Sequence, residues 1–224
     1  MVSTKVYLEA GSKRVFACAL DWPGWCRPGR TEDEALSRLA EYAPRYAAVT
    51  AAAGLDVSEM SAPTFEVVER LDGSATTDFG APVAVANADR EPARDSEAER
   101  LVALVAAAWA VLDDVAARAP ESLAKGPRGG GRDRDGMMQH VLGAETAYAR
   151  KLAVRHSEPA FEDRPAIGAL RYAIEQALRE RLPAATVTGS GWPPRYAARR
   201  IAWHVLDHAW EIEDRGGLTP RMAP

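Results

Sequence analysis

The chain has 224 residues, of which 47% are hydrophobic and 27% charged, and it carries a formal net charge of −4 at pH 7. This composition is typical of a globular protein with one large domain or two small ones. Neither half of the chain concentrates Lys and Arg, which argues against the basic surface of a nucleic-acid-binding protein.

The signals of secretion and membrane insertion are also missing. No apolar stretch approaches the ~20 residues that span a bilayer, and the amino terminus shows no signal-peptide pattern. Cys18 and Cys26 match neither a disulfide framework nor a Cys-x-x-Cys metal site. We therefore expect a cytoplasmic protein with reduced cysteines, a small-molecule substrate, and no nucleic-acid or membrane partner.

Residues 1–75 have the pattern of a small α+β domain. Strand-like runs occur at 5–9, 15–20 and 64–71. Between the second and third runs, a capping box at 31–34 opens a helix with apolar residues at helical spacing. Pro44 is expected to kink this helix or to end it early.

The spacing of apolar residues becomes helical after a predicted linker. Residues 76–94 hold Gly80, Pro82 and Pro92 among many small and charged residues and are predicted to join two domains, although an edge strand at 81–86 would also fit. In residues 95–224, four amphipathic helices are predicted: one opened by the capping box at 96–99, then 133–156, 163–182 and 195–215. The predicted fold class is therefore an α+β domain followed by an all-α four-helix bundle.

Three of the four histidines face the predicted core. His204 and His208 are four residues apart, so their rings leave one helix on the same face, about one turn apart. His140, in an earlier helix, also points inward. If these two helices run parallel, the three rings meet near the end of the bundle formed by loops 119–132 and 183–194.

A metal ion accounts for this convergence better than chance. A lone inward histidine is more often a hydrogen-bonded core residue, and a His-x-x-x-His pair also arises by accident. Three imidazoles buried at one level without a metal would each need a partner, because an unpaired buried polar group is costly. We therefore predict that His140, His204 and His208 hold one divalent ion, zinc or nickel first, with iron or manganese as alternatives. His156, at a helix end, is expected to be exposed.

The two histidine-bearing segments, MQHVLGAE at 138–145 and AWHVLDHAWE at 202–211, resemble the DinB-like superfamily. Its members are four-helix metalloproteins with one histidine on an early helix and His-x-x-x-His on a later one. The resemblance covers about residues 95–215 and implies that His140, His204 and His208 are the metal ligands. It also implies a thiol-dependent isomerase or transferase that uses mycothiol, bacillithiol or a similar low-molecular-weight thiol.

The amino-terminal segment VFACALDWPGWC at 15–26, followed by GRTEDEAL at 29–36, is similar to HicB-like antitoxin domains. Those domains have a strand, a Pro-Gly turn and a helix that begins with a Thr-Glu-Glu-Ala pattern. The similarity implies a HicB-like fold for residues 1–75. No DNA-binding module accompanies it, so contact with a protein partner or formation of a homodimer is the expected role.

Three neutral nitrogens leave a divalent ion with an open coordination position, which is the arrangement of a catalytic site. Asp207 and Glu211 each follow a histidine by three residues and are candidates to orient an imidazole or accept a proton, although flanking acids are more often simply solvated. Arg199 and Arg200 are candidates to hold an anionic group, and Trp192 to line a pocket.

Two classes of function follow from this site. The first is a metal-dependent enzyme, either a thiol-dependent transferase or isomerase or a hydrolase that uses metal-bound hydroxide. The second is a non-catalytic metal-binding stress or regulatory protein whose HicB-like domain mediates partner contacts. The sequence alone does not decide between them.

Overall fold

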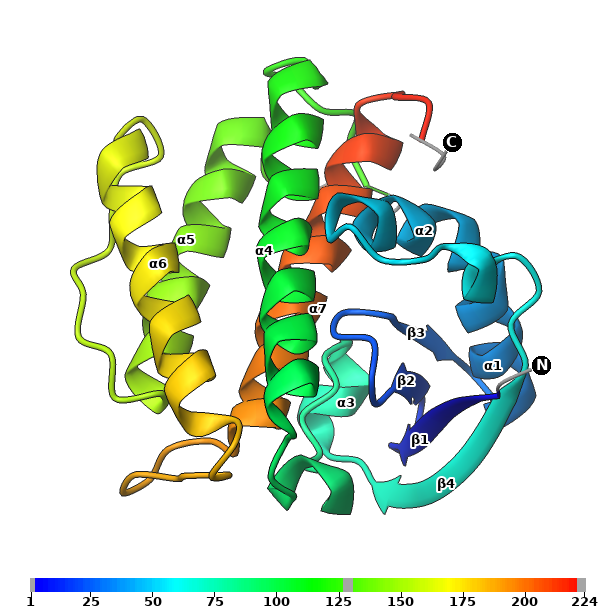
Figure 1. Ribbon diagram of the computed structural model, residues 1–224. Coiled ribbons are helices and arrows are strands. Elements are labelled where there is room, and N and C mark those ends of the chain that lie inside the picture. The colour runs from blue at the N-terminus through cyan, green and yellow to red at the C-terminus, as the bar shows by residue number, and fades with distance from the viewer. Residues whose placement is uncertain (1–2, 127–130, 221–224) are drawn as a thin grey trace.

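The computed structural model describes residues 3–126 and 131–220. Within these ranges a four-stranded sheet lies in the first third of the chain, and helices make up most of the rest (Figure 1). β2 pairs antiparallel with both β1 and β3, and β4 lies parallel to β1. The spatial order is β3-β2-β1-β4, and the strands are β1 (Thr4–Ala10), β2 (Val15–Ala19), β3 (Cys26–Gly29) and β4 (Phe65–Asp72).

Two helices, α1 (Glu32–Glu41) and α2 (Ala43–Ala52), connect β3 to β4. The first begins as the sequence predicts, because the Thr31 side chain accepts a hydrogen bond from the Glu34 backbone N–H at 3.2 Å. Pro44 lies in the first turn of α2, where its missing N–H costs nothing. The single helix expected here is thus divided in two at Tyr42.

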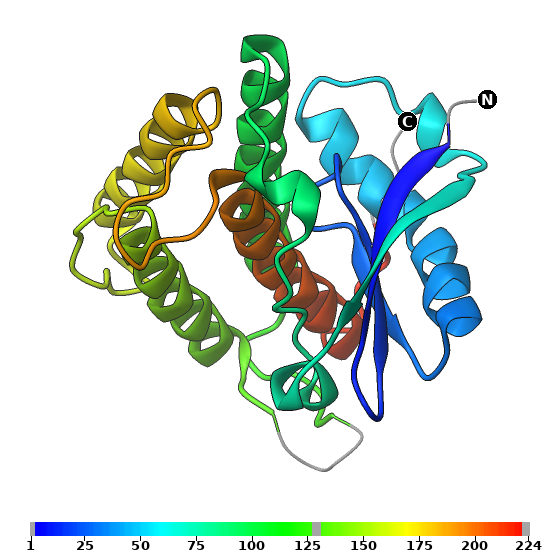
Figure 2. The same cartoon turned by 90° about the horizontal axis from the view of Figure 1, so that it is seen from below.

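Helices α4 to α7 form the other side of the molecule. Figures 1 and 2 show α4 and α7 lying between the sheet on one side and α5 with α6 on the other. α5 and α7 run antiparallel: the Trp192 N–H donates to the Lys151 carbonyl at one end, and the Ala124 N–H to the Arg215 carbonyl at the other. The bounds are α4 (Asp95–Arg118), α5 (Arg134–Lys151), α6 (Arg164–Arg181) and α7 (Pro194–Arg215).

The predicted fold class, an α+β domain followed by an all-α bundle, is wrong. The described residues form one four-stranded sheet and seven α-helices that share their apolar core. One face of the sheet contributes Val6 and Leu8 to the same cluster as Leu104 of α4 and Ile201 of α7. The other face is covered by Trp203 of α7. The sheet therefore packs on the helices directly instead of forming a unit beside them.

The physical reason lies in α7. Every residue from Tyr196 to Leu206 is buried except Arg200, so the helix is covered all round rather than along one stripe. A helix of this kind cannot lie at the outer edge of a four-helix bundle, because its second face would be exposed. The segment 76–94 contributes to this cover: it forms α3 (Ala75–Phe79) and the short helix η2 (Asn87–Arg90), and no strand at 81–86. The domain limits themselves stay a prediction.

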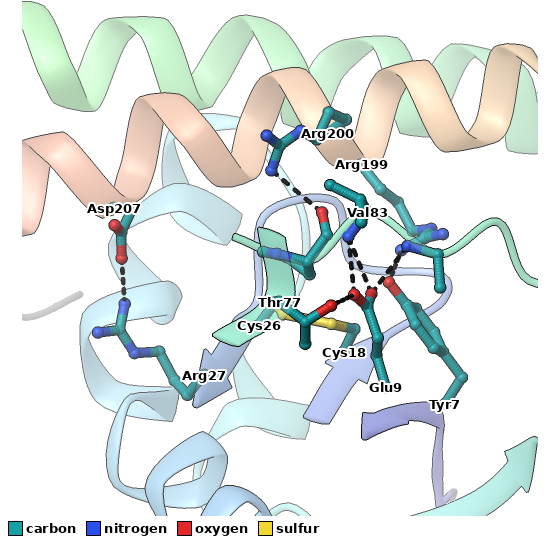
Figure 3. Close-up of a disulfide and its surroundings, with 12 residues drawn as sticks. Tyr7, Glu9, Cys18, Cys26, Arg27, Thr77, Val83, Arg199, Arg200 and Asp207 are labelled. Atoms are coloured by element: carbon teal, nitrogen blue, oxygen red, sulfur yellow. Dashed lines mark hydrogen bonds and ion pairs between the residues drawn. A yellow bond between two sulfur atoms is a disulfide. The ribbon is translucent and has the colours of Figure 1, made fainter. Parts of the chain in front are cut away.

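Cys18 and Cys26 are joined by a disulfide, so the expectation of reduced cysteines is wrong (Figure 3). The two residues are direct partners in the antiparallel register of β2 and β3, with Cα atoms 4.1 Å apart. A tight turn between the strands sets this register: the Trp25 N–H donates to the Trp22 carbonyl at 3.0 Å, and Gly24 adopts a φ of 90°. The spacing of eight residues does not by itself reveal the pairing.

None of the helices in the described ranges has an apolar stretch long enough to cross a bilayer.

Candidate metal centre

His140, His204 and His208 meet between α5 and α7. One nitrogen from each ring lies within 4.8 Å of the other two. The ring centroids are 5.2 Å apart for His140 and His204, 5.0 Å for His140 and His208, and 4.6 Å for His204 and His208. Nitrogen ligands of a tetrahedral zinc ion, at about 2.0–2.1 Å from the metal, lie about 3.4 Å from one another. Small ring rotations would therefore close the three histidines on one ion.

The antiparallel course of the two helices brings the histidines to one level. His140 lies in the second turn of α5, whereas His208 lies two turns before the end of α7. Loops 119–132 and 183–194 would lie at the same end if the two helices ran parallel, and this condition is not met. The structure instead places the 183–194 loop beside the end of α5 and the segment around Ala124 beside the end of α7. The histidines lie toward the second of these ends.

Burial keeps two of the imidazoles neutral. His204 is 8% exposed, and its Nδ1 has no hydrogen-bond partner among the described residues. Desolvation, followed by the nearby His208, Arg200 and His140, holds the pKa of His204 well below its ordinary value. The pKa of His140 is also lowered, first by desolvation and then by the nearby His208 and Arg132, while Glu211 acts in the opposite direction. Neutral imidazole is the form that binds metal, and an ion would satisfy the partnerless nitrogen of His204.

Glu211 orients the third histidine. Its carboxylate lies 3.1 Å from Nδ1 of His208 and also accepts a hydrogen bond from Arg215 at 2.9 Å. The hydrogen bond from His208 is the largest cause of the lowered pKa of Glu211. With Nδ1 of His208 engaged in this way, Nε2 is the nitrogen left for a metal.

Asp207, the other acidic candidate, is turned toward the sheet. Its carboxylate accepts a hydrogen bond from Arg27 of β3 at 3.1 Å (Figure 3). Asp207 and Glu211 have the same spacing from a histidine, so helical geometry alone could not separate them. The two residues differ in their ion-pair partners. Asp207 pairs with Arg27 of the sheet, whereas Glu211 pairs with Arg215 of α7 itself.

The structure separates the three residues predicted to form a pocket, which are Arg199, Arg200 and Trp192. Arg199 is buried and faces the sheet, where it donates to Asp89 and, at 2.9 Å, to the Tyr7 hydroxyl (Figure 3). Arg200 lies between the two sides of α7: its guanidinium is over the ring of Trp203, which faces the sheet, and over that of Tyr148, which lies beside His204. Trp192 packs against Tyr148 at a tilt, with ring centroids 5.1 Å apart.

Tyr148 is the residue that sequence reasoning missed at this site. Its ring centroid lies 5.7 Å from that of His204, and its phenyl face also meets Trp192 and Arg200. It follows His140 by eight residues, slightly more than two turns, which places it about 80° round α5 from His140. That spacing was the available signal.

Comparisons of this chain with protein-family models, with curated proteins and with solved structures find no match. The site therefore has to be judged on its own chemistry. Three imidazoles on two helices, with a carboxylate behind one of them, could hold a metal ion and leave a position open for water or substrate.

Proposed function

We propose that the protein is a metal-dependent enzyme whose divalent ion is held by His140, His204 and His208. The observation that carries the proposal is the meeting of three imidazoles from two helices, one of which, His204, is buried and has an Nδ1 without a partner in the described part of the chain. Zinc or nickel suits such nitrogen ligands best, with iron or manganese as alternatives.

The chain's own residues prepare this centre. His204 is kept neutral by burial, and Glu211 holds His208 by its Nδ1 so that Nε2 remains free. When bound, the ion would supply a Lewis acid that lowers the pKa of a thiol or a water at the open position.

We further propose that a low-molecular-weight thiol, such as mycothiol or bacillithiol, is the cosubstrate of a transferase or isomerase reaction. The resemblance of the histidine-bearing helices to the DinB-like superfamily suggests this class. A second observation agrees with it. Cys18 and Cys26 are bonded to each other, so the chain offers no free cysteine of its own as a nucleophile.

Metal analysis tests the first part of this proposal. Wild-type protein dialysed against zinc should retain about one ion per chain, and His204→Ala should lose it. His156→Ala is the matched control, because the half-buried His156 lies outside the triad, with its Nδ1 2.7 Å from the Ser157 carbonyl. Equal, substoichiometric metal in all three proteins would reject the metal centre.

Thermal shift measurements test the second part. Mycothiol, bacillithiol and glutathione should be compared on metal-loaded and metal-free protein. A shift that requires the metal would support a thiol cosubstrate. If none of the three thiols shifts the metal-loaded protein, the thiol is rejected and hydrolysis by metal-bound hydroxide becomes the better proposal.

A further inference from the structure

Arg200 holds a fixed positive charge one helical turn before His204. Its guanidinium carbon lies 4.6 Å from the ring centroid of Trp203 and 5.5 Å from that of Tyr148, so the group is stacked on two aromatic rings. One of its terminal nitrogens donates to the Pro82 carbonyl at 3.1 Å (Figure 3). These contacts position the guanidinium without neutralising it.

No carboxylate in the described part of the chain lies within 4 Å of Arg200. This sets it apart from its neighbours on the helix. Arg199 is paired with Asp89, and Arg215 with Glu211. An arginine that is held in place but has no anion of its own retains the full capacity to bind a carboxylate.

The acidic residues near the triad are already occupied. Asp207 is paired with Arg27 at 3.1 Å, and Glu211 is shared by His208 and Arg215. The surroundings of the three histidines therefore carry an excess of positive charge at Arg200. A divalent ion on the histidines would increase that excess. A neutral substrate would leave this charge uncompensated, whereas an anionic one would balance it.

We infer that the substrate bound at the metal carries a carboxylate or a comparable anionic group, and that Arg200 binds this group while the metal binds the reacting atom. The inference rests on the proposed function and adds the charge of the substrate to it. Tyr148 takes part by holding the guanidinium beside His204, since its ring touches both side chains. The substrate is thus held at two points, which fixes its orientation at the ion.

The test compares thiols that differ only in charge. Protein loaded with Co(II) should be titrated with 3-mercaptopropionate and 6-mercaptohexanoate, each against its neutral amide, and binding followed by the thiolate-to-cobalt absorption. The two chain lengths cover different distances between the metal and Arg200. For at least one length, the carboxylate should bind about tenfold more tightly than its amide, as expected for a hydrogen bond between charged groups.

Substitutions test whether Arg200 is the source of the preference for the carboxylate. Arg200→Gln should abolish the preference for the carboxylate while leaving amide binding unchanged, and Arg200→Lys should restore part of it. Arg150→Gln removes an exposed positive charge from α5 and should behave as wild type. Cobalt content and circular dichroism of each variant show that the fold and the metal centre are retained.

The outcomes separate this inference from the proposed function. If cobalt is not retained, the metal centre itself fails and the inference fails with it. If cobalt and the thiols bind but carboxylate and amide are equal at both lengths, only the anionic-substrate inference is overturned. The same holds if the preference survives in Arg200→Gln. If no thiol binds to the cobalt-loaded protein, the inference fails together with the thiol part of the proposed function.

Discussion

Nδ1 of His208 lies 3.1 Å from the carboxylate of Glu211, one turn further along the same helix. The carboxylate is held in turn by Arg215 at 2.9 Å. This chain of contacts fixes the direction of the His208 ring before any ligand arrives. Groups behind a metal ligand commonly change metal affinity by 10–100-fold.

Glu211→Gln should therefore weaken zinc binding by about 10–100-fold, because the amide orients the ring without its negative charge. The dissociation constant can be measured by competition with a chromogenic chelator. Asp207→Asn is the matched control: it also follows a histidine by three residues, but its partner is Arg27 on the sheet. Equal zinc affinities in the two variants would contradict the role given to Glu211.

The stability of the metal-free protein should fall as the pH is lowered. His140 and His204 have pKa values below their ordinary value in the folded protein, so the unfolded chain binds protons first. Their contribution to stability is complete above the ordinary histidine pKa of about 6.5 and is lost as the pH falls from there toward the lowered values.

Urea unfolding of metal-free protein between about pH 8 and about pH 5 measures this effect. The double variant His140→Gln, His204→Gln should show a smaller decrease in the free energy of unfolding over the same range. An identical decrease in wild type and variant would show that other groups cause it.

Reduction of the disulfide should destabilise the protein without emptying the metal centre. Closing the short loop between Cys18 and Cys26 is worth about 2–3 kcal/mol by the chain-entropy relation. The free energy of unfolding should decrease by that amount in a phosphine reductant that carries no thiol, while bound zinc stays the same. Cys18→Ala, Cys26→Ala is the control, since its stability should not respond to the reductant.

The buried pair of Arg199 and Asp89 should be among the most sensitive contacts between α7 and η2. Both side chains are almost fully buried, and Arg199 also donates to the Tyr7 hydroxyl of β1. Asp89→Ala should lower the free energy of unfolding by about 3–5 kcal/mol, because it leaves a buried charge without its partner. Denaturant titration would measure this loss in the free energy of unfolding. The double variant Asp89→Leu, Arg199→Met should recover most of the loss; a loss as large as that of the single variant would point to packing instead.

The sequence predicted part of this structure for identifiable reasons. The inward orientation of His140, His204 and His208 was predicted from helical periodicity, which is a local property. The start of α1 and the break at Pro44 were local as well. These features need no knowledge of which elements pack together.

The predictions that were wrong depended on contacts between elements far apart in the sequence. The pairing of Cys18 with Cys26 depends on the register of two strands, and the placement of Asp207 depends on Arg27 from the sheet. The fold class failed because nothing local reveals that the second face of α7 is covered by the sheet. The run of apolar residues around Trp203 is the available sign, because a helix buried on one side alone has a single apolar stripe.

The cover on both sides of α7 restricts how this helix can change in evolution. It presents His204 and His208 to α5 on one side and Arg199, Trp203 and Asp207 to the sheet and η2 on the other. Inserting or deleting one residue among these positions would rotate everything after it by about 100°. The two sides would then lose their common register, so this stretch should tolerate substitutions far better than changes of length.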